Sequence, residues 1–110
     1  MNDEVMVVMV TAGSEAEADQ LARVLVGERL AACVNLVAPI RSIYRWKGEV
    51  CDDREVLMII KTRSSRFDAL DRRVRQLHSY EVAEVIGWPV TRGAPDYLKW
   101  VADQAGGSSD

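Results

Sequence analysis

The segment Val56-Leu57-Met58-Ile59-Ile60 is wholly apolar and lies inside a longer extended stretch, residues 49–63. A strand with one exposed face alternates apolar and polar side chains, whereas an unbroken apolar run indicates a strand covered on both faces. Residues 5–10, Val5-Met6-Val7-Val8-Met9-Val10, have the same character. The sequence therefore predicts two strands, over 5–10 and 49–63, that are apolar on both sides.

The residues before this segment predict its hairpin partner. Residues 31–37 are extended and apolar, and the strand resumes over 40–46 after Pro39. Because proline cannot donate to a β-ladder, Pro39 indicates a bend or an edge position. A tight turn at Lys47-Gly48 leads into the returning strand. Alternation along the strand predicts a shared face for Ile40, Ser42, Tyr44 and Trp46.

The remaining elements follow from capping and periodicity. Ser14 and Glu17 form a capping box that opens a helix ending near Arg29. A second helix is expected from Ser65 to about His78. A strand over 82–90 and a short helix that begins at Pro95 complete the chain.

This order is βαββαβ followed by a C-terminal helix, which predicts an α+β, ferredoxin-like split βαβ sandwich. The 110 residues predict a single domain over 1–105 and a flexible tail over 106–110. In such a fold both helices cover the same face of the sheet, so the apolar opposite face needs another cover. Self-association is the favoured cover. The alternative is that the C-terminal helix alone folds across this face.

Composition argues against several classes of binding partner and indicates the cellular compartment. The formal charge of −3 and the pI near 5.2 argue against a nucleic-acid binder and against a membrane surface. The acidic start of the chain and its short apolar runs predict neither a signal peptide nor a membrane span, and so a cytoplasmic protein. In that compartment Cys33 and Cys51 are expected to be reduced.

Five strings of residues resemble the CutA divalent-cation-tolerance family, and the resemblance runs from Val5 to about Val101. These strings are Glu28 to Asn35, Ser42 to Gly48, Lys61-Thr62, His78 to Glu81, and Gly93 to Trp100. The resemblance implies a homotrimer in which the long second and third strands pair across subunits. It also implies a non-enzymatic role in tolerance to divalent metal ions, with copper(II) as the metal most often connected to the family.

A metal site is expected around the only histidine. Neutral imidazole suits copper and zinc, and nearby carboxylates add oxygen ligands, so His78, Glu81 and Glu84 are the candidate metal ligands. The alternative is that His78 stabilises the end of a helix and binds no metal. An enzyme that holds an anion at Thr11 to Ser14 is disfavoured, because that loop has no arginine and no nearby base.

A small-ligand site is also expected at a cleft between subunits. The family pattern suggests that it is lined by Tyr44, Trp46, Lys61 and Tyr80, and such residues suit a small anionic or polar ligand. The alternative is that these aromatic residues only pack in strands and interfaces. A further alternative is a trimeric module that resembles the PII signalling proteins in architecture and anchors a partner protein without metal.

Overall fold

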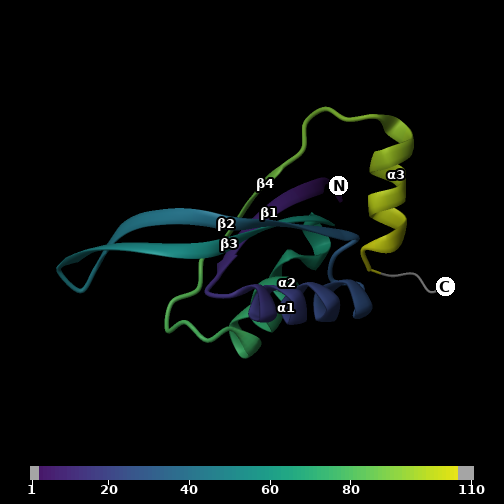
Figure 1. Ribbon diagram of the computed structural model, residues 1–110. Coiled ribbons are helices and arrows are strands. Elements are labelled where there is room, and N and C mark those ends of the chain that lie inside the picture. Colours follow the sequence, from purple (N-terminus) through teal and green to yellow (C-terminus); the bar gives the residue numbers. More distant parts are fainter. Residues whose placement is uncertain (1–2, 107–110) are drawn as a thin grey trace.

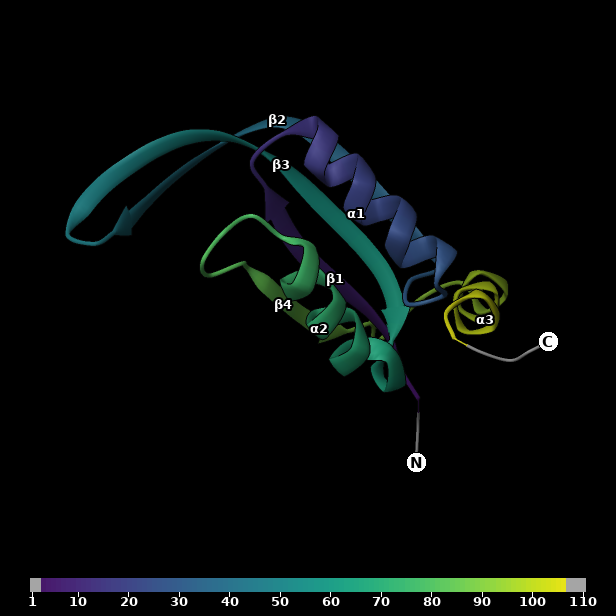
Figure 2. The ribbon, with the colours of Figure 1, turned by 90° about the horizontal axis from the view of Figure 1, so that it is seen from below.

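The computed structural model describes residues 3–106, which form a four-stranded sheet with two helices on one face and a third helix at one end (Figures 1 and 2). In chain order the elements are β1 (Val5–Ala12), α1 (Glu15–Gly27), β2 (Cys33–Trp46), β3 (Glu49–Arg63), a 3-10 turn (Ser64–Arg66), α2 (Phe67–Leu77), β4 (Val85–Pro89) and α3 (Pro95–Gln104). The predicted order βαββαβ with a C-terminal helix is confirmed.

All strand pairs are antiparallel, and the strands lie in the order β2-β3-β1-β4. The fourth strand is shorter than the predicted 82–90, because the chain before Val85 follows a separate path. There the backbone N–H groups of Ser79 and Tyr80 donate to side chains instead of to a strand. Residues 78–84, which we call the junction loop, therefore connect α2 to β4 without joining the sheet.

Pro39 has both of the predicted consequences. The strand β2 lies at the edge of the sheet, and its pairing with β3 shifts register between Val37 and Ile40. Beyond this shift the hairpin runs past the end of β1, whose last partner in β3 is Val56. Residues 40–55, which we call the arm, are therefore a two-stranded ribbon that projects from the body of the molecule (Figure 1).

The core lies between the sheet and the two helices α1 and α2. Side chains of β1 and β3 that point toward the helices are buried in this core. They include Val8, Val10, Ala12, Val56, Met58 and Ile60. The helices contribute Ala18, Leu21, Leu25, Leu70 and Val74. Burying one such aliphatic side chain stabilises the fold by about 1.5–3 kcal/mol. The predicted capping box also forms, since the Ser14 hydroxyl accepts a hydrogen bond from the Glu17 N–H at 3.1 Å.

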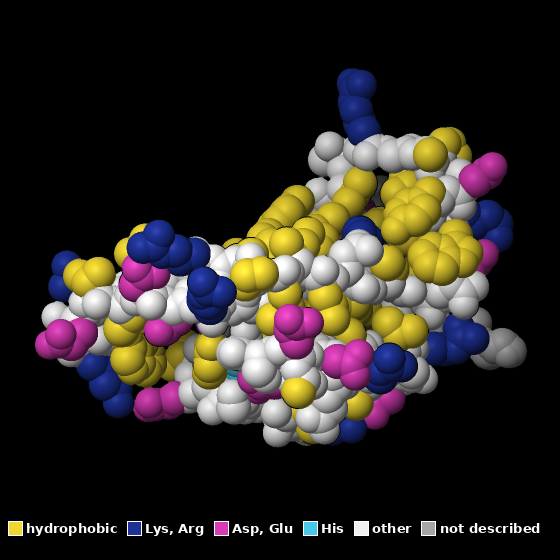
Figure 3. All heavy atoms as spheres, in the orientation of Figure 1, with side chains coloured by type: hydrophobic (Ala, Val, Ile, Leu, Met, Phe, Trp, Pro, Cys, Tyr) yellow, Lys and Arg dark blue, Asp and Glu magenta, His cyan; other side chains and the backbone are white. Residues whose placement is uncertain are grey.

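The helix α3 covers only one end of the sheet. It packs through Val101, which together with Ala105 just after the helix is buried against Val5 and Ala32. Large apolar side chains remain exposed elsewhere on the far face, the arm and α3, and Figure 3 shows hydrophobic side chains gathered between β4 and α3. They include Val37, Ile43, Val50, Ile86, Trp88, Tyr97 and Trp100. Within the single chain, the C-terminal helix therefore does not close the open face.

The end of the described chain is held in place. Gly106 is buried, has a φ of +91° that favours glycine, and accepts a hydrogen bond from Arg63 at 3.2 Å. The rest of the tail expected over 106–110 lies outside the described residues. The expectation of one domain over 1–105 stays a prediction.

Candidate functional site

A cleft with a volume of about 720 Å³ separates the arm from the junction loop. The arm contributes Ser42, Ile43, Tyr44, Trp46, Asp53 and Glu55 to its walls. The junction loop contributes Ser79, Tyr80, Glu81, Val82 and Glu84, and β1 contributes Thr11. The cleft is thus built from two segments that lie far apart in the sequence.

The arm lines the cleft mainly with the face that the alternation predicted, with Ile43 of the other face also at the wall. Ser42 pairs with Asp53 across the ribbon, and Tyr44 pairs with Cys51. The Tyr44 hydroxyl donates a hydrogen bond to the Asp53 carboxylate. This hydrogen bond raises the pKa of Tyr44 to about 12, with help from desolvation and from the Asp53 charge.

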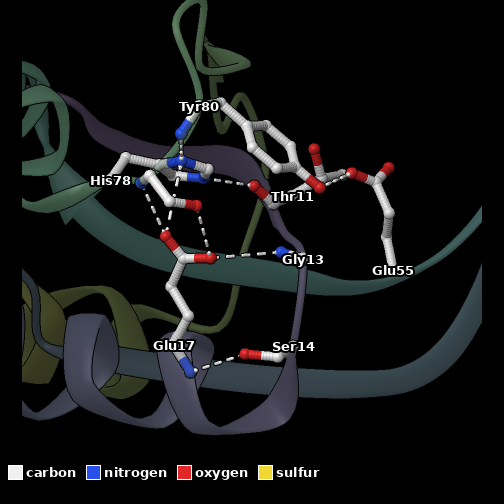
Figure 4. Close-up of polar contacts among 8 residues, drawn as sticks. Thr11, Gly13, Ser14, Glu17, Glu55, His78 and Tyr80 are labelled. Carbon is white, nitrogen blue, oxygen red and sulfur yellow. Dashed lines mark hydrogen bonds and ion pairs between the residues drawn. The ribbon is translucent and has the colours of Figure 1, made fainter.

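His78 fastens the junction loop to the body of the molecule. Its side chain is fully buried, with 0% exposure. The ring Nε2 donates to the Thr11 carbonyl oxygen at 2.7 Å, and Nδ1 accepts from the Tyr80 N–H at 3.0 Å (Figure 4). In these two bonds Nε2 is the donor and Nδ1 is the acceptor. As a metal ligand, His78 would have to give up one of them.

Glu17 ties the same loop to the first turn of α1. Its carboxylate accepts from the Ser79 N–H at 2.8 Å, from the Ser79 hydroxyl at 3.1 Å and from the Gly13 N–H at 3.3 Å (Figure 4). It also lies 3.6 Å from His78 Nδ1. Desolvation pushes the pKa of Glu17 upward, but the hydrogen bonds from the Ser79 N–H, the Ser79 hydroxyl and the Gly13 N–H outweigh it, so the pKa is lowered.

The lowered pKa of Glu17 predicts an acid-dependent loss of stability. A carboxyl group whose pKa is lowered by folding stabilises the protein above its unfolded pKa, and this contribution is lost as the pH falls through the folded pKa. We expect Glu17→Gln to remove that part of the pH dependence, measured by urea unfolding between about pH 3 and pH 7. The exposed neighbour Glu15 provides the control, and Glu15→Gln is expected to keep the steeper wild-type profile. Equal profiles for both variants would contradict the assignment.

Tyr80 connects the junction loop to the arm. Its hydroxyl donates to Glu55 Oε2 at 2.6 Å, and its ring centroid lies 4.6 Å from that of His78. Desolvation and the bond to Glu55 raise the pKa of Tyr80. At Gly13 an added Cβ atom would lie 3.1 Å from the Tyr80 hydroxyl, so the ring fits closely against the start of α1. A chain of contacts therefore runs from α1 through the loop to the arm.

The structure brings together most of the predicted site residues. Tyr44, Trp46 and Tyr80 meet in the cleft, with Glu81 and Glu84 at the junction loop. Two others lie elsewhere. Lys61 is on the open face of the sheet, where it donates to Asn35, and His78 is buried behind the loop.

Sequence reasoning missed the acidic wall of the arm. Asp53 and Glu55 belong to a charged run that reads as a solvated face, yet Glu55 is only 7% exposed. The hairpin register would have found them, since it places Asp53 opposite Ser42 and Glu55 opposite Ile40 on the cleft face. Glu17 could be found only as a capping residue, because its contact with Ser79 joins distant segments.

The carboxylates of the cleft are spread apart. Among residues 3–106, no three histidine, cysteine, aspartate or glutamate side chains converge closely enough to hold a metal ion. Oxygen ligands suit hard and borderline divalent ions, so Glu81 and Glu84 have suitable chemistry but do not complete a site within one chain. The ligand set of His78, Glu81 and Glu84 stays a prediction.

No helix in the described part of the chain is long and apolar enough to cross a membrane.

Curated proteins resemble this chain over most of its length. It is 46% identical over 100 residues to the "Divalent-cation tolerance protein CutA" of Thermus thermophilus, covering 91% of this chain and 97% of that protein. It is 52% identical over 101 residues to human "Protein CutA", covering 92% of this chain and 56% of that protein. A relative from Arabidopsis thaliana, 46% identical over 96 residues, is named "Protein CutA, chloroplastic", and the match covers 87% of this chain and 53% of that protein. The chain thus spans little more than half the length of the human and plant relatives.

Solved structures and a family model agree with these relatives. The "Divalent cation tolerance protein (Cut A1)" of Thermus thermophilus superposes with a TM-score of 0.90 at 45% identity, covering 93% of this chain and 99% of that one. The CutA1 structure from Oryza sativa gives 0.87 at 44% identity, covering 90% and 91%. The family model described as "CutA1 divalent ion tolerance protein" matches residues 6–104. The chain therefore belongs to the CutA1 divalent ion tolerance protein family.

Proposed function

We propose that this protein is a non-enzymatic, cytoplasmic homotrimer that serves divalent-cation tolerance by binding copper(II) or another divalent ion at clefts between subunits. The observation that carries the proposal is the match of the family model to residues 6–104, which includes the arm, the junction loop and the cleft between them.

The exposed apolar surface supports the assembly. On the side of the sheet away from α1 and α2, Ile86 is 54% exposed and Trp88 is 45% exposed, and on the arm Ile43 reaches 64%. Soluble monomers seldom expose contiguous apolar patches of this kind. A two-stranded ribbon is also marginally stable by itself, so the arm needs a neighbour to pack against. A second and third copy of the chain would cover both.

The placement of the carboxylates supports a metal site that is completed by assembly. Glu81 and Glu84 are exposed and line the cleft, whereas His78 has both ring nitrogens in hydrogen bonds. Since one chain does not gather three ligands, the remaining ligands would come from a neighbouring copy. In this proposal Glu81 and Glu84 contact the metal and His78 holds the loop that carries them.

Titration with copper(II) tests the metal part of the proposal. We expect the double variant Glu81→Gln/Glu84→Gln to bind copper about tenfold more weakly than the wild type, because two charged ligands are lost. The control Asp96→Gln, an exposed acid in the first turn of α3, is expected to bind as the wild type does. Sedimentation of the same samples checks that each variant keeps its assembly. Equal copper affinity in all three proteins would favour an anchoring module that works without metal.

A further inference from the structure

The cleft is strongly acidic. Asp53 and Glu55 project into it from the arm, and Glu81 and Glu84 line it from the junction loop. No lysine or arginine is among the described residues that line it. Because no three of these carboxylates converge on one point within the described chain, they can pair with several separate positive charges on one ligand.

Aromatic side chains also line the cleft, and the ammonium group of Lys47 already contacts both an aromatic ring and a carboxylate there. Tyr44, Trp46 and Tyr80 line the walls. The Lys47 Nζ lies 5.6 Å from the centroid of the Trp46 ring and 3.6 Å from the Glu81 carboxylate. An alkylammonium between a ring face and a carboxylate gains both cation–π and ionic attraction. The Lys47 and Glu81 side chains are both 71% exposed, so this internal contact is weak and can be replaced.

Glu55 provides an unfilled acceptor in the wall of the cleft. It is more than nine-tenths buried, with 7% exposure, and its Oε2 accepts from the Tyr80 hydroxyl. Its other oxygen receives no hydrogen bond from any described residue, and Figure 4 shows it directed away from Tyr80. This oxygen is not among the buried polar atoms that lack a partner, so solvent reaches it in the cleft and it is free to accept a hydrogen bond from a ligand.

We propose that the cleft binds a linear polyamine, an aliphatic chain that carries two or more ammonium groups. The ammonium groups pair with carboxylates at separate positions, from Glu55 within the cleft to Glu84 on the junction loop, and the methylene segments pack on the aromatic rings. The volume of about 720 Å³ accommodates such an elongated ligand. This inference rests on the proposed function in one respect, namely that the cleft stays open to solvent in the assembled protein.

Calorimetric titration of the assembled protein with spermidine tests the proposal. Asp53 and its neighbour Asp52 provide a matched pair, because Asp53 lines the cleft while Asp52 does not line it and forms an ion pair with Arg41. We expect Asp53→Asn to weaken spermidine binding about fivefold and Asp52→Asn to leave it unchanged. Trp46→Leu, which keeps an apolar side chain but removes the ring, is expected to weaken binding by a similar factor.

Three results would overturn the proposal. One is the absence of spermidine binding at about 1 mM to protein that sediments as an assembly. Another is an equal loss of affinity in Asp52→Asn and Asp53→Asn, which would indicate attraction to net charge alone. A third is unchanged spermidine affinity in Trp46→Leu, which would exclude a role for that aromatic ring. Copper titration of the same samples separates these outcomes from failure of the metal proposal.

Discussion

Ile86→Asn is expected to convert the assembled protein into single chains, whereas Val26→Asn leaves the assembly intact. Both residues are exposed β-branched aliphatic side chains, at 54% for Ile86 and 44% for Val26. Ile86 pairs with Met9 and lies on the open face of the sheet, while Val26 lies on α1, on the opposite side. In an isolated chain the two substitutions would have similarly small effects, so any difference between them reports what covers the open face.

The size of the expected effect follows from the number of copies. Replacing a covered isoleucine by a polar side chain costs about 2 kcal/mol through lost apolar burial and an added buried amide. A symmetric trimer contains this change three times, so the cost is about 6 kcal/mol, or roughly four decades in the assembly constant. A loss of this size in the assembly constant would dissociate the trimer even in a concentrated sample.

Sedimentation velocity over a range of concentrations measures this difference. The wild type and Val26→Asn are expected at three times the chain mass of 12.3 kDa, and Ile86→Asn at or near the single-chain mass. A folded wild-type protein that sediments as one chain at low concentration would contradict the trimer directly. Dissociation of both variants would show that the effect reflects general destabilisation.

The elements of the fold could be predicted from local patterns because each is specified by nearby residues. The strand β3 follows the predicted bounds 49–63 because a continuous apolar run is flanked by turn residues. The start of α1 follows from the capping box at Ser14. The fourth strand was predicted too long because the chain just before it, at Ser79 and Tyr80, is held by the side chains of Glu17 and His78, and such contacts leave no periodic signal.

The candidate site could be predicted only in part for the same reason. Alternation placed Tyr44 and Trp46 on one face, and both line the cleft. Lys61 shares a strand with the arm residues, but the register shift and the length of β3 put it on the body of the sheet, beside Asn35. The pairing register of the hairpin therefore identifies the residues that line the cleft better than their closeness in sequence to charged or aromatic residues does.

His78→Ala is expected to cause the largest loss of stability of any single change in the junction loop. The substitution removes a fully buried ring and leaves the Thr11 carbonyl and the Tyr80 N–H without their partner. A buried polar group without its partner costs about 1–3 kcal/mol, and the cavity adds to this, so we expect a loss of about 3–4 kcal/mol per chain. Urea unfolding at a fixed chain concentration measures it, because assembly makes stability depend on concentration.

Hydrogen exchange can distinguish whether the His78 side chain only holds the junction loop or also binds a metal ion. The Tyr80 N–H donates to His78 Nδ1, so its exchange in metal-free protein reports this bond alone. We expect His78→Ala to speed exchange at Tyr80 about tenfold or more, and His78→Gln, which can offer an acceptor again, to restore part of the protection. The control Gln76→Ala, an exposed residue in the last turn of α2, is expected to leave it unchanged. If exchange at Tyr80 in the wild type is already fast without metal and slows only when copper is added, His78 acts as a ligand, and the junction loop is ordered by the ion instead of by the fold.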